Sequence, residues 1–272
     1  MEKVLIFGGR GYLGRAFQSL YSSALCPDVD IADVSAVAEI LDREKPDVVI
    51  NAAGKTGRPN IDWCEEHKEE TLRSNLTGPL VLLEECSQRN IYWVHLSSGC
   101  IYEGDKGGRG FTEEDPPNFT GSFYSRVKGW ADQVLGEFPV LILRLRMPFD
   151  GSTNERNLLM KLRKYPKVLD VQNSLTYLPD FLSAAKTLIE RRWTGIYNIV
   201  NPGTVSPYEI MALYKKIAVH DHPCERLSLK DLSSVVRAAR SNCVLSIAKL
   251  QREGIVLPDV HRRVEEALHT MT

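Results

Sequence analysis

The sequence predicts an α/β protein whose central sheet is parallel and carries helices on both faces. Short apolar runs alternate with helical segments along the first half of the 272 residues, and a glycine-rich turn joins the first apolar run to the first helix. Successive βα units of this kind build a parallel sheet with right-handed crossovers. The length suffices for one large domain, or for a domain with a small lobe, around a well-buried core.

The strands are predicted from short apolar runs. The first is expected at residues 4–7, where the sequence Val-Leu-Ile-Phe ends at Gly8. The second, expected near residues 24–26, is short and poorly defined. Later strands are expected at 47–51, 91–96, 140–145 and 196–200.

Helical periodicity predicts the helices between these strands. The first helix begins at Tyr12, inside the glycine turn, and the second has Asp33 or Ser35 as its N-cap. The expected ranges are 12–22, 33–43, 66–88, 122–137, 155–164, 181–191 and 206–216.

A change of pattern after residue 146 predicts two parts. Residues 1–146 form the parallel-sheet domain, to which 168–200 return strands and helices, and 147–272 form mainly a smaller lobe. The segment 104–118 is rich in Gly, Asp, Glu and Pro, and it is expected to be a mobile segment near a site.

Composition argues against several classes of protein. Charged residues make up 25% of the chain and the net charge is −1, so nothing indicates nucleic acid or a membrane as a partner. The apolar run at the amino terminus is too short for a signal peptide, and no stretch approaches the ~20 apolar residues of a membrane span. The six cysteines show no CxxC pairing. We therefore expect no metal site, no disulfide framework, and a cytoplasmic location.

The glycine turn predicts a dinucleotide site. Gly8, Gly11 and Gly14 follow a strand and open a helix, where they permit a tight turn, close approach of the backbone to a pyrophosphate, and close helix packing. Backbone N–H groups at the helix start, around Tyr12 and Leu13, would hold the phosphates. The plain alternative is an ordinary glycine-rich βα turn. The small residues of Asn51-Ala52-Ala53-Gly54 after a later strand support the cofactor site.

The choice of cofactor stays open between NADPH and NADH. An acid about 20 residues past the turn is typical of NAD sites, and Asp28 stands near that place. Arg10, inside the turn, could instead reach a 2′-phosphate, although it could equally be a solvated surface residue. We expect NADPH, with NADH as the alternative.

Ser98, Tyr124 and Lys128 form a plausible proton-relay set. Tyr124 and Lys128 are four residues apart and share one face of a helix. A nearby ammonium is expected to lower the pKa of the phenol, which donates a proton to a carbonyl oxygen as hydride reaches the carbon. Ser98 would hydrogen-bond the same oxygen. The alternative is a surface Tyr–Lys pair and a serine that caps a strand end.

At this point the chain resembles the extended short-chain dehydrogenase/reductases. More narrowly, it looks like the plant nucleotide-rhamnose synthase/epimerase-reductases, which are similar in turn to the dTDP-4-dehydrorhamnose reductases. The most specific segment is 117–125, Pro-Asn-Phe-Thr-Gly-Ser-Phe-Tyr-Ser. The other matching segments are 51–54, 56–60, 62–65, 98–101, 144–148, 201–203 and 240–242.

The resemblance implies a Rossmann-type, doubly wound parallel sheet with a small C-terminal substrate-binding lobe. It implies a bifunctional enzyme that epimerises C3 and C5 of a nucleotide-linked 4-keto-6-deoxyhexose and reduces the 4-keto group with NADPH. Cys100 and Lys161 match the acid–base pair of the epimerase, and Asn75 joins the cofactor site. For the substrate, the cations Arg58, Arg146 and Arg240, with Lys161, are candidates to bind the diphosphate. The amides assigned to the sugar nucleotide are Asn60, Asn118 and Asn242.

Two other functions remain open. A mono-functional 4-reductase would need Tyr124 and Lys128, but neither Cys100 nor Lys161. A non-catalytic regulatory subunit on the same fold would need none of them. The base, uridine or thymidine, and the final sugar stereochemistry are undetermined, and helices 66–88 and 122–137 are candidates for a homodimer interface.

Overall fold

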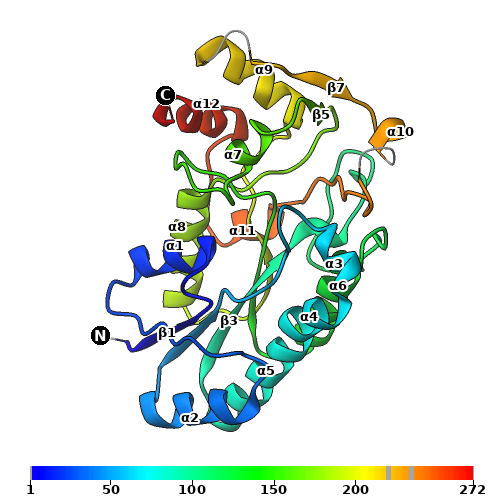
Figure 1. The fold of residues 1–272 in the computed structure, drawn as a ribbon. Helices are drawn as coiled ribbons and strands as arrows, with labels where there is room; N and C mark the ends of the chain where they lie inside the picture. Colours follow the sequence, from blue (N-terminus) through cyan, green and yellow to red (C-terminus); the bar gives the residue numbers. More distant parts are fainter. Residues whose placement is uncertain (1, 219–221, 233–235, 272) are drawn as a thin grey trace.

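The computed structural model describes residues 2–218, 222–232 and 236–271, and its main feature is a five-stranded parallel sheet (Figure 1). The strand order is β1-β2-β3-β4-β6, and every neighbouring pair is parallel. The strands are β1 (Val4–Phe7), β2 (Val48–Asn51), β3 (Tyr92–Ser98), β4 (Leu141–Leu145) and β6 (Gly195–Asn198). The predicted fold class is therefore confirmed.

The strand expected near residues 24–26 does not form. Leu25 makes a single parallel bridge with Leu5, through Ile6 N–H to Leu25 O at 2.8 Å and Leu25 N–H to Val4 O at 2.9 Å. Pro27 follows two residues later and has no N–H with which to continue a ladder. The prediction of a strand here was wrong.

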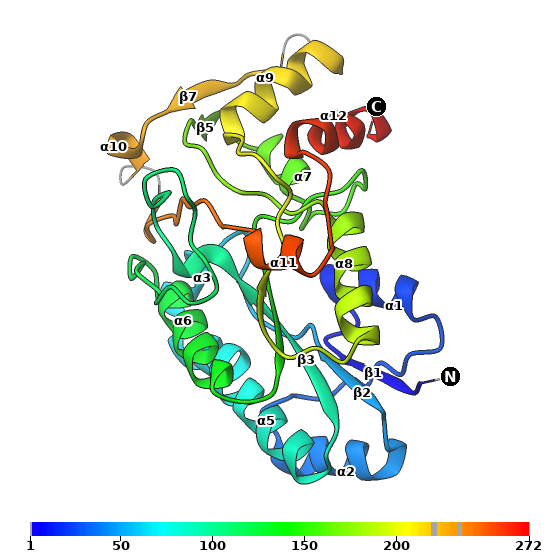
Figure 2. The ribbon, with the colours of Figure 1, turned by 180° about the vertical axis from the view of Figure 1, so that it is seen from behind.

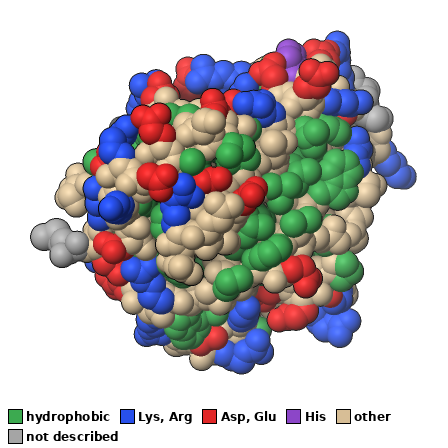
Figure 3. Space-filling model, turned by 90° about the horizontal axis from the view of Figure 1, so that it is seen from below, with side chains coloured by type: hydrophobic (Ala, Val, Ile, Leu, Met, Phe, Trp, Pro, Cys, Tyr) green, Lys and Arg blue, Asp and Glu red, His purple; other side chains and the backbone are tan. Residues whose placement is uncertain are grey.

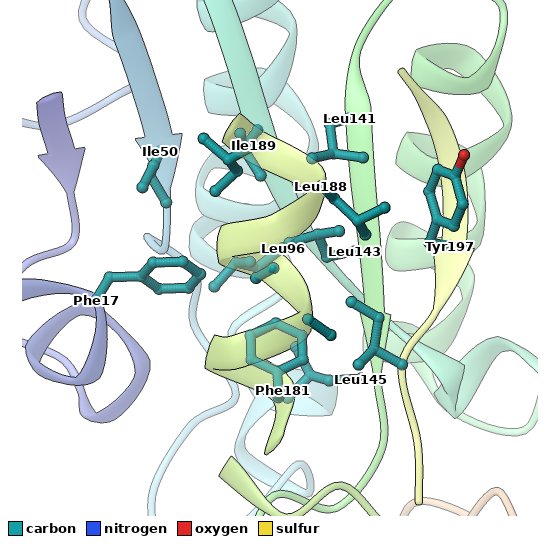
Figure 4. Packing of buried hydrophobic residues seen from close by; sticks show 14 of the residues in the cluster. Phe17, Ile50, Leu96, Leu141, Leu143, Leu145, Phe181, Leu188, Ile189 and Tyr197 are labelled. Atoms are coloured by element: carbon teal, nitrogen blue, oxygen red, sulfur yellow. The ribbon is translucent and has the colours of Figure 1, made fainter. Parts of the chain in front are cut away.

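Two layers of helices cover the sheet, one on each face (Figures 1 and 2). Successive side chains of a strand point to opposite faces, so Val4 and Ile6 pack on one side and Leu5 and Phe7 on the other. The first side is covered by α1 (Tyr12–Leu20) and α8 (Leu178–Glu190), whose Phe17 and Phe181 meet edge to face (Figure 4). The second side is covered by α2 (Val34–Glu44), α5 (Gly78–Gln88) and α6 (Phe123–Gly136).

The helix expected at 66–88 is built from several segments. α3 (Trp63–Glu66) and α4 (Lys68–Leu72) lead into one π turn, Arg73–Thr77, before α5. Pro79 stands at the start of α5 and cannot donate to the carbonyl four residues earlier, at Asn75. Single π turns inside helices are frequent at functional sites.

The smaller lobe contains a two-stranded parallel sheet, β5 (Lys167–Leu169) with β7 (Glu225–Leu227). Around it lie α7 (Leu158–Leu162), α9 (Pro207–Ile217), α10 (Leu229–Leu232) and α12 (Val260–Thr270), while α11 (Ala248–Arg252) lies beside β6. The basic helix expected at 155–164 is shortened to α7. Its start is set by Asn157, whose side chain accepts from Leu159 N–H and donates to Asp150 O and Ser152 O.

The glycine-rich segment 104–118 is anchored by backbone hydrogen bonds to residues 242–246. Gly104 N–H donates to Asn242 O and Phe111 N–H donates to Val244 O, both at 2.8 Å. None of residues 104–118 lines the cleft described below, but Asn242, to which Gly104 is bonded, does. Among the described residues, no helix has the length and apolar character to span a bilayer.

Candidate active site

One cleft of about 1260 Å³ lies at the carboxyl ends of the parallel strands and reaches into the lobe. In open α/β sheets, ligands bind at this edge, because the loops that follow the strands converge there. The cleft is lined by the turn after β1, the segments after β2, β3 and β4, part of α6, and lobe residues from α7, β5 and 240–242. The structure thus brings most of the predicted site residues to one place.

The glycine turn has the shape that a dinucleotide requires. Gly8 has φ +76°, and a Cβ there would lie 2.5 Å from Ala53 N. A Cβ on Gly14 would lie 2.7 Å from the Cα of Gly9. These two glycines shape the turn without lining the cleft, whereas Gly11, Tyr12 and Leu13 line it at the start of α1. No side chain caps that helix start, so its first N–H groups are available to an anion.

Behind the turn, Asn51 is fully buried and shapes the site from beneath. Its Oδ1 accepts from Ala53 N–H at 3.0 Å, and its Nδ2 lies 3.1 Å from Nδ1 of His95. Ala52, Ala53 and Gly54 line the cleft directly. Asn75, in the π turn, also lines it and donates to Lys55 O at 2.9 Å.

Ser98, Tyr124 and Lys128 all line the cleft. Ser98 ends β3, and Tyr124 and Lys128 occupy one face of α6, which Ser122 caps by accepting from Ser125 N–H. Tyr124 is 9% exposed and Lys128 is 4% exposed. Their position at the floor of a cleft argues against the alternative of a surface pair.

The electrostatics of Tyr124 differ from the prediction. Burial raises the pKa of the phenol well above its ordinary value, Cys100 adds to the effect, and Arg146 opposes it. The amine of Lys128 contacts β3 instead: its Nζ donates to Leu96 O at 3.1 Å and lies 3.3 Å from Nε2 of His95. The expected lowering was therefore wrong. The phenol stays protonated at neutral pH, which is the form needed to donate a proton.

Cys100 and Lys161 enter the same cleft from the sheet side and from the lobe. Cys100 lies in the 3₁₀ turn η2 (Gly99–Ile101), where its N–H donates to Ser98 Oγ at 3.2 Å. Lys161 lies on α7, and burial, followed by the charge of Arg156, lowers its pKa. A lysine with a lowered pKa is more readily a neutral amine, which can act as a base.

Five of the predicted substrate residues line the cleft. Arg58 and Asn60 line the cleft, as does the buried Arg146, whose Nη2 donates to Asn173 Oδ1 at 2.8 Å. Arg240 and Asn242 also line the cleft, but Arg240 already pairs with Asp62 at 2.8 Å.

Asn118 does not line the cleft. Its Oδ1 accepts from Glu103 N–H at 2.8 Å and its Nδ2 donates to Glu103 O at 3.0 Å, so both ends of the amide hold the backbone of a loop. The predicted role of Asn118 in binding sugar is therefore not supported by its position.

Sequence reasoning missed Arg156. Its Nη1 donates to Gly57 O at 2.7 Å, which ties the lobe to the segment after β2. Burial, followed by the charge of Arg58, lowers the pKa of Arg156, while Glu155 opposes that lowering. The cation lies five residues before Lys161, and only the folded turn at the start of α7 brings it into the cleft. Among the described residues, no group of three metal-binding side chains occurs.

The fold and the Ser98–Tyr124–Lys128 set define a Rossmann-type protein of the short-chain dehydrogenase/reductase class. More narrowly, the chain belongs to the family described as the RmlD substrate binding domain, whose profile matches residues 1–272. The predicted resemblance is confirmed, and with it the prediction that the chain is an enzyme.

Relatives with known names agree with this family. A bifunctional dTDP-4-dehydrorhamnose 3,5-epimerase/dTDP-4-dehydrorhamnose reductase of Arabidopsis thaliana is 39% identical over 267 residues, which cover 92% of this chain and 86% of the relative. A trifunctional UDP-glucose 4,6-dehydratase/UDP-4-keto-6-deoxy-D-glucose 3,5-epimerase/UDP-4-keto-L-rhamnose-reductase of the same plant is also 39% identical, but the match spans only 40% of its length.

Solved structures show the same fold. The UDP-rhamnose synthase of Acanthamoeba polyphaga mimivirus superposes with a TM-score of 0.94 at 34% identity, covering 99% of both chains. The dTDP-4-dehydrorhamnose reductase of Bacillus anthracis, in complex with NADP, has a TM-score of 0.84 at 20% identity and covers 99% of this chain and 98% of its own. At that identity, the second likeness concerns the fold alone.

Proposed function

We propose that the chain epimerises C3 and C5 of a nucleotide-linked 4-keto-6-deoxyhexose and then reduces its 4-keto group with NADPH. The observation that carries the proposal is the convergence of two residue sets on one cleft. Ser98, Tyr124 and Lys128 suit reduction, and Cys100 with Lys161 suits epimerisation. The names of the relatives support both activities.

The residues of the glycine turn fit the dinucleotide. The uncapped start of α1 offers N–H groups to phosphates, and the small side chains of Ala52, Ala53 and Gly54 leave room for a nucleotide beside them. NADPH, when bound, supplies the hydride. The chain supplies the proton, because Tyr124 is protonated and Ser98 offers a second hydroxyl to the same ketone oxygen.

The epimerase proposal follows from the acidity of the substrate. The 4-keto group acidifies the protons on C3 and C5, so a positioned base can remove one and an acid can return one on the opposite face. Burial and Arg156 lower the pKa of Lys161, which makes its neutral amine available as base nearer to neutral pH. Cys100 faces the same cleft as the second proton-transfer group.

Cations from the lobe and from the segment after β2 support a diphosphate-bearing substrate. Arg58, Arg156 and Lys161 line the cleft. Burial lowers the pKa of Arg156 and of Lys161, and repulsion adds to it, from Arg58 on Arg156 and from Arg156 on Lys161. A diphosphate between them would relieve that repulsion, and guanidinium groups suit its paired oxygens. Arg240 contributes less positive charge to the cleft, because it forms an ion pair with Asp62.

The test is incubation with UDP- and dTDP-4-keto-6-deoxyglucose plus NADPH in heavy water, followed by NMR of the product. Oxidation of NADPH together with deuterium at C3 and C5 is the expected result. Oxidation without deuterium would replace the proposal with a mono-functional reductase. If neither NADPH oxidation nor deuterium incorporation occurs with either nucleotide, the result favours the non-catalytic alternative.

Cofactor preference is expected to depend on Arg10. Arg10 lines the cleft, is 79% exposed, and pairs with Asp28 at 2.6 Å, so the two residues that argued for different cofactors lie together. We expect Arg10→Ala to raise the Michaelis constant for NADPH about tenfold, since a charge-assisted hydrogen bond contributes roughly 1.5–3 kcal/mol. The constant for NADH should change little. Arg43→Ala, which alters an exposed arginine outside the cleft, is the control. A wild-type preference for NADH would contradict the proposal.

We propose that the chain forms a homodimer through α6. Trp130, Val134 and Phe138 are 45%, 42% and 44% exposed along this helix and its end, and Leu72 of the adjacent α4 is 36% exposed. Figure 3, seen from below, shows hydrophobic side chains gathered on one side of the molecule. Apolar patches of this kind mark protein interfaces.

Trp130→Glu is expected to convert the dimer to a monomer in sedimentation experiments, because the new charge would be buried without a partner. Val256→Glu is the matched control, since Val256 is 75% exposed elsewhere on the surface. A wild-type chain that sediments as a monomer at micromolar concentration would contradict the dimer.

The proposed location remains the cytoplasm, which all six free cysteines support.

A further inference from the structure

The guanidinium of Arg146 is buried beside the proposed reductase residues. Arg146 follows β4 directly, lines the cleft and is 6% exposed. Leu145, the last residue of β4, pairs with Ser98 in the parallel register. Gly99 and Arg146 come next along the two segments, and a Cβ on Gly99 would lie 3.4 Å from Cδ of Arg146. The arginine side chain therefore packs against the turn that carries Cys100.

One end of this guanidinium is held by neutral groups. Its Nη2 donates to Asn173 Oδ1 at 2.8 Å and to Ser241 O. Asn173 is fully buried, and its own Nδ2 donates to Val171 O at 3.0 Å and to Asn242 Oδ1 at 3.1 Å. A cation that is fixed in this way does not have to reorient when negative charge develops beside it.

The other nitrogens of the guanidinium have no partner. An arginine has five N–H donors, and the two contacts of Nη2 leave those of Nε and Nη1. Among the described residues, nothing accepts from Nε or Nη1 of Arg146, and no carboxylate forms an ion pair with it. Buried charges in proteins are ordinarily paired. An unpaired cation at the wall of a cleft suits a negative group on the ligand.

The charge of Arg146 acts near the ketone-reducing residues and not within the cluster of cations assigned to the diphosphate. Burial raises the pKa of Tyr124, and the charge of Arg146 opposes that rise. The other cations act on one another: besides burial, Arg58 lowers the pKa of Arg156, and Arg156 lowers that of Lys161. Arg146 is not among the groups that shift either pKa.

Both proposed reactions place negative charge on one oxygen, O4 of the substrate. When a base removes the proton from C3 or C5, the electrons of that C–H bond form an enolate, whose charge lies on O4. They return to the carbon when it takes a proton on its opposite face. In reduction, C4 receives a hydride from NADPH and O4 receives the proton of Tyr124. A fixed cation beside O4 stabilises the transition states of both reactions.

We propose that Arg146 is a catalytic residue of both reactions, and that its unpaired N–H groups stabilise the negative charge on O4. Tyr124 and Ser98 offer hydroxyl groups to the same oxygen, and Arg146 adds a positive charge. This inference rests on the proposed function. It replaces the role expected for Arg146 from the sequence, which is to bind the diphosphate. Asn173 is the positioning residue that fixes the guanidinium.

Arg146→Gln is expected to lower the rates of ketone reduction and of deuterium exchange at C3 and C5. The expected loss is about 10²–10³-fold, which is typical when one oxyanion-binding donor is removed. The affinity for UDP and dTDP, which carry the diphosphate but no ketone, should equal that of the wild type. The rates are measured by NADPH oxidation and by NMR in heavy water, and the affinity by calorimetry. Weaker binding of both nucleotides, or unchanged rates, would overturn the inference.

Arg58→Gln is the matched comparison, because it makes the same change in a cation assigned to the diphosphate. It should weaken the binding of UDP or dTDP, the loss that Arg146→Gln should not show.

Arg146→Lys keeps the positive charge and tests whether charge is what matters. It should reduce and exchange faster than Arg146→Gln, and equal rates in the two variants would contradict the inference. If Arg146→Gln does not fold, Arg146→Lys decides. A rate below that of the wild type with unchanged nucleotide affinity supports the inference, whereas weaker affinity or an unchanged rate overturns it.

The inference and the proposed function fail in different ways. A wild-type chain that neither reduces nor exchanges overturns the proposed function and the inference with it. An active wild-type chain whose Arg146→Gln variant is equally fast overturns the inference alone. If the wild type reduces without exchange, the reduction rate of Arg146→Gln decides.

Discussion

Tyr124→Phe is expected to lower the rate of ketone reduction by about 10²–10⁴-fold, the range typical of positioned acid catalysis. The phenol is buried at the floor of the cleft, and burial keeps it protonated at neutral pH. Phenylalanine keeps the ring and its packing but has no proton to donate. The rate is measured by NADPH oxidation with the 4-keto sugar nucleotide, and retention of the dinucleotide by fluorescence titration.

Tyr102→Phe is the matched control for this variant. Tyr102 belongs to the same apolar cluster as Tyr124, but it does not line the cleft, and its hydroxyl donates to Asp115 O at 2.6 Å. Its loss should cost about 1 kcal/mol of stability and leave the reduction rate unchanged. If Tyr124→Phe reduced the ketone as fast as Tyr102→Phe does, Tyr124 would not be the proton donor.

Cys100→Ser is expected to abolish most deuterium incorporation at C3 and C5 while the cofactor still binds. A thiol is far more acidic than an alcohol, so serine fills the space but exchanges protons poorly near neutral pH. The expected loss is again about 10²–10⁴-fold, since the step is general acid–base catalysis. The measurement is NMR of the sugar after incubation in heavy water.

Cys243→Ser provides the comparison for that loss. Cys243 is also buried in the cluster around Tyr124, and its Sγ donates to Gly99 O at 3.1 Å, but it does not line the cleft. Exchange should persist in Cys243→Ser, and reduction of an already epimerised sugar should persist in both variants. Unchanged exchange in Cys100→Ser would remove the epimerase assignment and leave the reductase.

Much of the site was predictable because its residues are close in sequence. The glycine turn joins a strand and a helix whose bounds follow from local pattern, and β1 is found at its predicted residues. Tyr124 and Lys128 share a face through helical spacing alone. Cys100 follows Ser98 at a strand end, so both reach the same edge of the sheet.

Other expectations failed where a distant contact competes with local pattern. Asn118 resembles a ligand by its place in a specific segment, but the backbone of Glu103 occupies both ends of its amide. The strand expected near residues 24–26 does not form, because Pro27 has no N–H to continue a ladder and Leu25 bridges only Leu5 of β1. Arg156 reaches the cleft and contacts Gly57 only because Asn157 stabilises the turn before α7.

The amino-acid sequence by itself determined the parallel architecture, the dinucleotide turn and the residue types of the reductase set. These features follow from helix and strand periodicity, which depends on residues only a few positions apart. Tertiary structure alone decided the electrostatics of that set. Burial raises the pKa of Tyr124, with Cys100 adding to the effect and Arg146 opposing it, and burial lowers the pKa of Lys128, with Cys100 and Asp132 opposing it. Desolvation and hydrogen-bond direction are properties of neighbours in space, and Asn51, His95 and Lys128 become neighbours only when the sheet and the helix have packed.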